Sequence, residues 1–403
     1  MEEVRLGTLT NRKIGYGIVQ PGACVPHGTP VIKVNNIISG LRNIRDLDTT
    51  SIENDKKYSR TKLKGGELIV SVVGTIGRTA IVPMSFAGCN LVRATALIDI
   101  PDVQMSKWVK YYIDSPKGQN YIRENLNTTV QPTLNVKSLV EMPIPVYSAQ
   151  YMQKAIEILG DLDDKIEVNR RINDNLEQQA QALFKSWFVD FDPFKDGEFE
   201  ETELGLIPKG WEVVSLSAIA DYINGLAMQK YRPVEGEKGL PVLKIKELGQ
   251  GNTDDSSELC SPSLIGEKYI IDDGDIIFSW SGTLMVKVWC GGKCGLNQHL
   301  FVVEPKDYPH WFAYQWTKHH LDNFIHIAKD KAVTMGHIKR GELDKAKVVV
   351  PDRTSMGAVD SMMKPLHRQI ISNKIESRRL AKLRDTLLPR LMSGEIKVGD
   401  ITL

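Results

Sequence analysis

The chain carries the same order of motifs twice, and this duplication constrains its fold more than any other feature. Pro30-Val31-Ile32-Lys33 is matched by Pro241-Val242-Leu243-Lys244, at an offset of 211 residues. Residues 162–188 align without a gap with residues 366–392, at an offset of 204. Since the offset falls by only a few residues, the two halves are copies of one unit with small deletions. Such a chain is expected to do one thing at two places.

Each half opens with a region that we predict to be a strand-rich domain, at residues 1–150 and 211–352. Short β-branched runs bounded by glycine or proline indicate strands. They lie at 31–34, 68–73 and 97–100 in the first domain and at 242–245, 276–280 and 300–303 in the second. A helical run follows in each, over 108–126 and 311–327. The expected fold class is therefore α+β, with two duplicated domains.

A long heptad pattern follows each domain, over 151–190 and 353–393. Apolar residues at 3/4 spacing are typical of a coiled coil. At ~1.5 Å per residue, each helix would reach about 50 Å. We predict that these two spacer helices pair antiparallel, which would give the duplicated molecule a pseudo-two-fold axis. The predicted interface residues are Leu159, Leu162, Ile166, Asn169, Leu176, Leu183, Trp187, Leu366, Ile370, Asn373, Leu380, Leu387 and Leu391.

Two asparagines, Asn169 and Asn373, fall at equivalent positions of this seam. One interpretation is that the register drifts slightly, so that both side chains lie on the helix surface. The other is that buried asparagines fix the register and the partner of each helix. The sequence leaves both open.

The charges are segregated although the net charge is only +1. Residues 1–150 hold 18 Lys and Arg against 12 Asp and Glu, whereas residues 151–210 hold 7 against 14. A basic first domain permits nucleic-acid binding, and the acidic stretch indicates a solvated region or a basic partner. Within it, residues 191–210 are predicted to be an acidic linker with little that can be buried, and 394–403 a tail.

Composition indicates a soluble, cytoplasmic protein. Hydrophobic residues make up 42% of the chain, and no run of about 18 apolar residues could span a membrane. The start shows no signal-peptide pattern. Five scattered cysteines suggest reduced thiols.

No catalytic motif stands out. The chain lacks a Gly-x-x-x-x-Gly-Lys-Ser/Thr loop, and Gly15-Tyr16-Gly17 lacks the rest of a dinucleotide fingerprint. Cys290 and Cys294, with His299 nearby, lack a second ligand pair at zinc-finger spacing and are interpreted as free thiols in a turn. No metal or cofactor is therefore expected on this chain.

Polar residues at matching places in the two domains are candidates for DNA contact. Lys33 and Asn35 would share one strand face, as would Lys244 and Lys246, although a solvated face explains them equally. The turns of the Ser-x-x-Gly-Thr repeats require either a positive φ or close ligand contact. Asn297-Gln298-His299 could read an adenine edge or cap a strand. The full candidate set is Arg12, Lys13, Lys33, Asn35, Arg42, Arg78, Arg93, Lys244, Lys246, Trp280, Lys287, Asn297, Gln298 and His299.

The chain resembles the specificity subunits of type I restriction-modification systems. The resemblance is carried by the segments 166–173, 183–191 and 207–211 and by the end of the second helix, 387–396. It extends over essentially the whole chain and is specific in the helices and linker. It implies that each domain is a target recognition domain for one half of a split DNA sequence.

The same resemblance implies a non-catalytic role in a larger complex. The helices would space the half-sites, centred about 10–15 base pairs apart, and dock two modification subunits that methylate adenine, with restriction subunits joining them. S-adenosylmethionine, ATP and magnesium are then expected on those partners. The alternative from the residues alone is a coiled-coil scaffold that recruits proteins without reading DNA.

Overall fold

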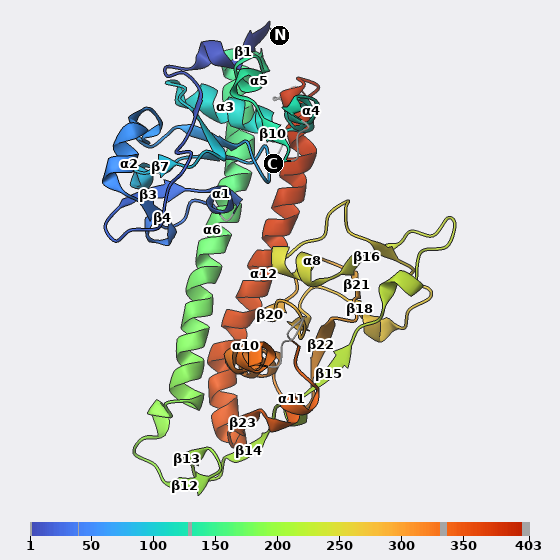
Figure 1. The fold of residues 1–403 in the computed structure, drawn as a ribbon. Helices are drawn as coiled ribbons and strands as arrows, with labels where there is room; N and C mark the ends of the chain where they lie inside the picture. Colours follow the sequence, from blue (N-terminus) through green and yellow to red (C-terminus); the bar gives the residue numbers. More distant parts are fainter. Residues whose placement is uncertain (1, 39, 128–130, 331–336, 397–403) are drawn as a thin grey trace. The chain divides into compact units, whose positions relative to one another are not determined.

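The computed structural model describes residues 2–38, 40–127, 131–330 and 337–396. The chain divides into two compact units, Met1–Asp163 with Lys382–Leu403 (unit 1) and Asp164–Ala381 (unit 2). Each unit holds one strand-rich domain together with a part of the long helices α6 (Ala149–Phe188) and α12 (Arg353–Met392) (Figure 1). The predicted mixed class, with two strand-rich domains and long helices, is confirmed.

Unit 1 is built from short strands and helices. Its strands are β1 (Glu2–Arg5), β2 (Gly15–Tyr16), β3 (Thr29–Ile32), β4 (Asp48–Thr50), β5 (Leu68–Ser71), β6 (Thr79–Ile81), β7 (Asn90–Leu91), β8 (Thr95–Ile98), β9 (Leu126–Asn127), β10 (Thr133–Leu134) and β11 (Pro143–Val146). Its shorter helices are α1 (Val34–Ile38), α2 (Ile52–Lys57), α3 (Val103–Asp114), α4 (Pro116–Glu124) and α5 (Val136–Val140), with 3₁₀ turns η1 (Leu6–Leu9), η2 (Ile44–Asp46), η3 (Ser59–Thr61) and η4 (Met84–Phe86).

Unit 2 repeats most of these elements and has a hairpin before them. Its strands are β12 (Phe199–Thr202), β13 (Gly205–Pro208), β14 (Glu212–Ser215), β15 (Ala220–Asn224), β16 (Leu240–Leu243), β17 (Leu259–Cys260), β18 (Ile270–Ile271), β19 (Ile276–Ser279), β20 (Met285–Val288), β21 (Cys294–Leu296), β22 (Leu300–Pro305) and β23 (Lys347–Val350). Its shorter helices are α7 (Leu216–Ile219), α8 (Ile245–Gln250), α9 (His310–His319), α10 (Leu321–Asp330) and α11 (Gly341–Lys345), with 3₁₀ turns η5 (Asp192–Phe194), η6 (Met228–Lys230) and η7 (Glu267–Tyr269).

The sheets of the two domains have matching topology. The order β2-β8-β5-β6 in unit 1 corresponds to β15-β22-β19-β20 in unit 2, and both sheets are antiparallel throughout. A smaller sheet, β4-β3-β7, corresponds to the first three strands of β17-β16-β21-β18. Each smaller sheet contains one parallel pair, β3 with β7 and β16 with β21. The duplication seen in the sequence is thus a duplication of fold.

The long helices contribute directly to the domain cores. In unit 1, Leu159 and Leu391 are fully buried in the same cluster as Trp108 of α3. In unit 2, Phe184 and Phe188 of α6 are buried in the main core. These phenylalanines, rather than the neighbouring Leu183 and Trp187 that we predicted, are the most deeply buried residues at this end of α6. Here the helix packs on a domain, so the buried face no longer follows the heptad seam.

Within unit 2 the two helices run antiparallel and meet through asparagines. The Asn373 side chain donates to Asn173 Oδ1 at 2.9 Å, and Asn173 donates to the Ile370 carbonyl at 3.2 Å. Asn169 donates to Glu376 at 2.7 Å. Asn169, Asn173 and Asn373 are all less than 7% exposed. The interpretation that the asparagines lie on the helix surface is wrong, because they bond across the seam, where polar groups need partners.

The other predicted seam residues differ in burial. Leu162 and Ile370 are buried, whereas Ile166, Leu176, Leu366, Leu380 and Leu387 are partly buried. A seam that stays partly open along its length leaves room for contacts beyond the pair itself.

Both long helical runs predicted inside the domains are broken. In unit 1 the run splits into α3 and α4, because Ser115 caps a new helix whose first residue is Pro116. In unit 2 it splits into α9 and α10 at His320. The break therefore belongs to the duplicated fold, although only the first copy has a proline to signal it.

The acidic stretch after α6 is more ordered than predicted. It contains the hairpin of β12 and β13, and Ile207 is only 1% exposed. Phe191 and Phe194 pack against Trp211, with ring centroids 5.9 and 4.8 Å away. These apolar side chains anchor the segment to unit 2 while its carboxylates stay in solvent. Among the described residues, none of the helices combines the length and apolarity needed to cross a bilayer.

Candidate nucleic-acid interface

In each domain the chain after β2 or β15 crosses closely over the strand β7 or β21. Gly17 and Gly225 occupy the crossing points. A Cβ atom on Gly17 would lie 2.1 Å from the Leu91 carbonyl oxygen, and one on Gly225 would lie 2.3 Å from that of Asn297. Glycine is therefore required at both places, because any side chain would collide with backbone.

The crossing holds a tight turn in place, at residues 92–95 and 297–300, which we call the crossing turn. In unit 1, Arg93 N donates to the Ile18 carbonyl at 2.8 Å and Thr95 N to the Val92 carbonyl at 2.9 Å. In unit 2, the matching bonds run from Gln298 N to Leu226 at 2.8 Å and from Leu300 N to Asn297 at 3.0 Å. The backbone is thus the same, and the central residues are Arg93-Ala94 and Gln298-His299.

The side chains of the crossing turn differ between the domains. Arg93 is exposed, and its guanidinium has no hydrogen-bond or ion-pair partner among the described residues. Gln298 lies 3.4 Å from His299 Nε2, and His299 Nδ1 contacts Ser281 Oγ at 3.0 Å. Asn297 is 6% exposed, and its side chain accepts from the His299 amide. Asn297 therefore stabilises the turn, whereas Gln298 and His299 present polar atoms at the surface.

An aromatic ring lies beside the second crossing turn. Trp280 Nε1 donates to Asn224 at 3.0 Å, and its ring centroid lies 5.7 Å from Phe301 and 6.3 Å from His299. The ring is half-buried, with Asn224 fixing its direction. Its unit 1 counterpart in the repeat is Val72, so this side of the turn also differs between the copies.

The Ser-x-x-Gly-Thr repeats form tight turns in both units. Gly74 and Gly282 have φ values of 77° and 64°. Ser71 Oγ donates to the Thr75 carbonyl at 2.6 Å, and Ser279 makes the same bond in the second copy at 2.8 Å. The interpretation that these glycines provide a positive φ is confirmed. In unit 1 the turn is followed by Arg78, whose side chain is exposed.

The expected alternation along one strand face is wrong for Lys33 and Lys244. Strands β3 and β16 end one residue earlier, and the two lysines lie at the starts of α1 and α8. Asn35 and Lys246 therefore belong to helices. The backbone amides of Lys33 and Lys244 donate to the side chains of Asn36 and Glu247, three residues later in the chain. These capping bonds explain why each helix starts directly after the lysine.

These lysines also have acidic neighbours. Lys33 is paired with Asp48 of β4, and Lys244 with Glu258 at 2.7 Å. Lys246 contacts Ser256 at 3.1 Å. Since exposed pairs are weak, a phosphate could displace such carboxylates, but the pairing already accounts for the lysines in the absence of DNA.

Two further basic candidates, Arg12 and Lys287, make hydrogen bonds within their own domains. Arg12 bonds Glu67 at 2.7 Å and Asp99 at 2.6 Å, in a network that includes two backbone carbonyls. Lys287 is half-buried and donates to the Gly249 carbonyl at 2.7 Å. Burial, followed by the charge of Lys374, lowers the pKa of Lys287. By contrast, Lys13 and Arg42 are exposed.

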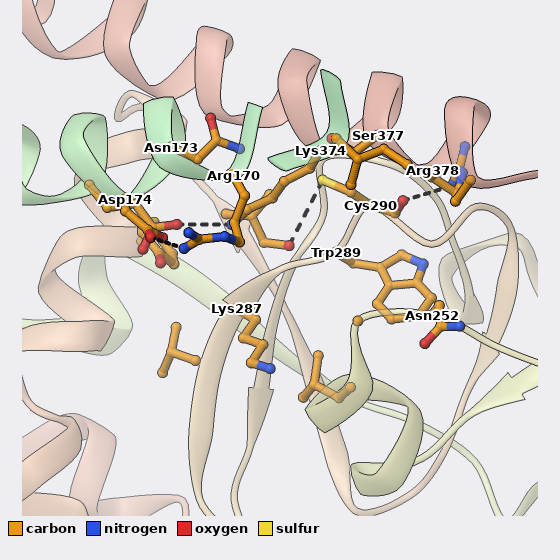
Figure 2. A pocket seen from close by; sticks show the side chains of 18 of the residues that line it. Arg170, Asn173, Asp174, Asn252, Lys287, Trp289, Cys290, Lys374, Ser377 and Arg378 are labelled. Carbon is orange, nitrogen blue, oxygen red and sulfur yellow. Dashed lines mark hydrogen bonds and ion pairs between the residues drawn. The ribbon is translucent and has the colours of Figure 1, made fainter. Parts of the chain in front are cut away.

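Lys287 faces a cavity of about 660 Å³ that lies wholly within unit 2, between the helices and the domain (Figure 2). Its charged lining residues are mostly paired. Lys374 bonds Glu177 at 3.0 Å, and Arg378 bonds Asp273 at 2.6 Å and the Cys290 carbonyl at 2.8 Å. The first bond joins the two long helices, and the bonds of Arg378 tie α12 to the domain, so these contacts give the cavity a structural explanation.

The described cysteines support no metal centre. Cys290 and Cys294 are free and buried, and burial raises the pKa of their thiols to about 11 and about 12. No group of three or more His, Cys, Asp or Glu residues with metal-binding geometry occurs among the described residues.

Comparison with known proteins identifies the family. Residues 2–178 and 208–377 match the family described as the type I restriction modification DNA specificity domain. The chain is 29% identical over 310 residues to the type I restriction enzyme MjaIX specificity subunit of Methanocaldococcus jannaschii, covering 74% of this chain and 71% of that protein. It is 25% identical over 328 residues to the HindI specificity subunit of Haemophilus influenzae, covering 66% and 71%.

A solved structure agrees in fold. The S subunit of a type I restriction-modification system from M. genitalium matches with a TM-score of 0.51 at 14% identity, covering 97% of this chain and 95% of that one. Since the family matches both halves, the chain belongs to the type I restriction-modification DNA specificity family. This family is defined by DNA recognition, and its specificity subunits are non-catalytic.

Sequence reasoning missed the two crossing glycines. Gly17 was considered only as part of an incomplete dinucleotide motif, and Gly225 was not singled out. A signal was present, because Gly17 and Gly225 are separated by 208 residues, the same offset that relates Ser71 to Ser279. A glycine kept at both copies of a repeat is the pattern expected where backbones approach closely.

Proposed function

We propose that this chain reads a bipartite DNA target, with one half-site for each strand-rich domain. The observation that carries the proposal is the crossing turn. Its backbone is the same in both units, but its exposed side chains differ. A reading module needs a rigid support with variable polar groups, because base edges are distinguished by the pattern of donors and acceptors.

The proposal includes docking of two modification subunits, and through them restriction subunits, on the long helices. Val168 and Ile172 are 48% and 42% exposed on α6, one turn apart, beside the buried Asn169 and Asn173. An apolar pair at this spacing suits a partner helix. Adenine methylation would occur on those partners, which would hold S-adenosylmethionine, ATP and magnesium.

The test is co-expression of the chain with its modification subunit, followed by mapping of methylated adenines in the host genome. We expect one split word with a constant spacer, its half-site centres about 10–15 base pairs apart. Val168→Asp with Ile172→Asp should abolish co-purification of the modification subunit. The matched control is Gln178→Asp with Gln179→Asp, at exposed polar positions of the same helix.

The competing function is a protein scaffold that does not read DNA. A mobility-shift assay with the co-expressed complex separates the two. Binding that ignores sequence at moderate salt would favour the scaffold and contradict the proposal.

A further inference from the structure

Resting on the proposed function, we infer which bases the crossing turns read. Arg93 contacts a guanine in the half-site of the first domain, and Gln298 contacts an adenine in that of the second. The base pair facing the turn is therefore G·C in one half-site and A·T in the other.

The two crossing turns share five backbone hydrogen bonds, two of which are described above. In the third, the amides of Gly17 and Gly225 donate to the carbonyls of Thr95 and Leu300. In the other two, Ile18 and Leu226 donate to Leu91 and Leu296, and Val92 and Asn297 donate to Ile32 and Leu243. Gly17 N donates at 3.3 Å and Gly225 N at 3.0 Å. Because these backbone hydrogen bonds are the same, the side chains of Arg93 and Gln298 project from equivalent positions of the turn. A change of side chain there changes what is read without changing where it is read.

Arg93 has the chemistry that guanine requires. The guanidinium offers only donors, and guanine presents two acceptors, O6 and N7, in the major groove. An adenine would place its N6 amino donor against the guanidinium, which leaves one bond unmade. Arg93 is exposed and has no partner among the described residues, so binding requires no internal bond to be broken.

Gln298 has the chemistry that adenine requires. Its amide carries one donor group and one acceptor, which match N7 and N6 of adenine in a bidentate pair. The contact with His299 Nε2 is long, at 3.4 Å, and is readily given up. His299 itself is held by Ser281 at 3.0 Å, so its ring remains beside the glutamine and supports it.

The experiment uses the complex of the full chain with its modification subunit and selects binding sequences from a random DNA library. For Arg93→Gln we expect one position of the first half-site to change from G·C to A·T, with a preference shift of about tenfold or more. For Gln298→Arg we expect the reverse change in the second half-site. In each case the other half-site should keep its sequence. Arg60→Gln is the control, because Arg60 is an exposed arginine of unit 1 that lies outside the turn and outside the set of candidate DNA contacts.

Each failure has a distinct meaning. A wild-type complex that selects no sequence overturns the proposed function itself. If the wild type is specific but both variants select unchanged words, the proposed function stands and the base assignment is wrong. If Arg93→Gln weakens binding equally on all sequences, Arg93 contacts phosphate and the assignment is again overturned. Arg93→Lys should keep the guanine, since lysine can also bond O6 and N7, and loss of guanine there counts against direct reading.

Discussion

The two strand-rich domains have the same frame but differ in two kinds of side chain. One kind lies at the crossing turn, where unit 1 has Arg93 and unit 2 has Gln298 at the equivalent position. The other kind is histidine, since seven of the eight histidines lie in unit 2. His367 of α12 is buried against His310 of α9, whereas His299 is exposed. The comparison teaches that duplication kept the backbone contacts, while both the surface and the core composition were free to diverge.

The largest loss of stability is expected where a substitution disrupts the close backbone crossing. Gly225→Ala places a Cβ 2.3 Å from two carbonyl oxygens, so the backbone must move. We expect unit 2 to lose about 3 kcal/mol of stability or more. The measurement is hydrogen exchange of unit 2 peptides in the full chain, combined with thermal unfolding.

Gly357→Ala is the matched control. Gly357 lies in α12, and a Cβ there would meet nothing within 4 Å. Alanine should stabilise the helix by about 1 kcal/mol. If both substitutions had the same effect, the close crossing would not be what requires glycine at position 225.

The second prediction uses the buried histidines to distinguish the units by pH. His310 Nδ1 and His367 Nε2 are 2.8 Å apart, and burial lowers the pKa of both, that of His367 to about 4. Tyr314 and Lys374 also face His367; the Lys374 charge lowers this pKa further, and that of Glu177 partly offsets it.

Because the folded pKa lies below the unfolded value of about 6.5, the unfolded chain binds more protons between these values. Stability is therefore full above pH 6.5 and falls as the pH drops towards 4. From pH 7 to pH 5 we expect unit 2 to lose about 2 kcal/mol through His367. Hydrogen exchange at the two pH values measures this. His367→Gln should flatten the dependence, and an unchanged slope would assign it to other groups.

The third prediction concerns the seam of unit 2. Asn373→Leu alone should cost about 1–3 kcal/mol, because Asn173 then keeps a buried carbonyl without a donor. The double variant Asn173→Leu, Asn373→Leu should recover much of this loss, since an apolar pair needs no partner. A double-mutant cycle measures the coupling. Additive costs would mean that the asparagines do not act as a pair.

Features that follow from local, repeated sequence patterns could be predicted, whereas features that depend on contacts between distant residues could not. The duplication, the strands of the main sheets and both long helices follow from periodicity, which is local and repeated. The helix break at His320 could not be predicted in this way, because no proline marks it. Lys33 was placed on a strand for a similar reason, since an Asn36 cap ends β3 one residue early. The ion pairs of Arg12 could not be predicted either, because its partners Glu67 and Asp99 are far away in the chain.

The smallest expected effect tests whether the crossing turn differs from its basic surroundings. Arg78 is exposed in unit 1, and its position after a tight turn suits a phosphate contact rather than a base contact. Arg78→Ala should weaken DNA binding only a few-fold at moderate salt and leave the selected word unchanged. The slope of log affinity against log salt should fall by about one unit, because one counterion fewer is released. Titrations at several salt concentrations measure this. A changed word with an unchanged slope would place base reading at Arg78, and the difference between the two domains would then extend beyond the crossing turn.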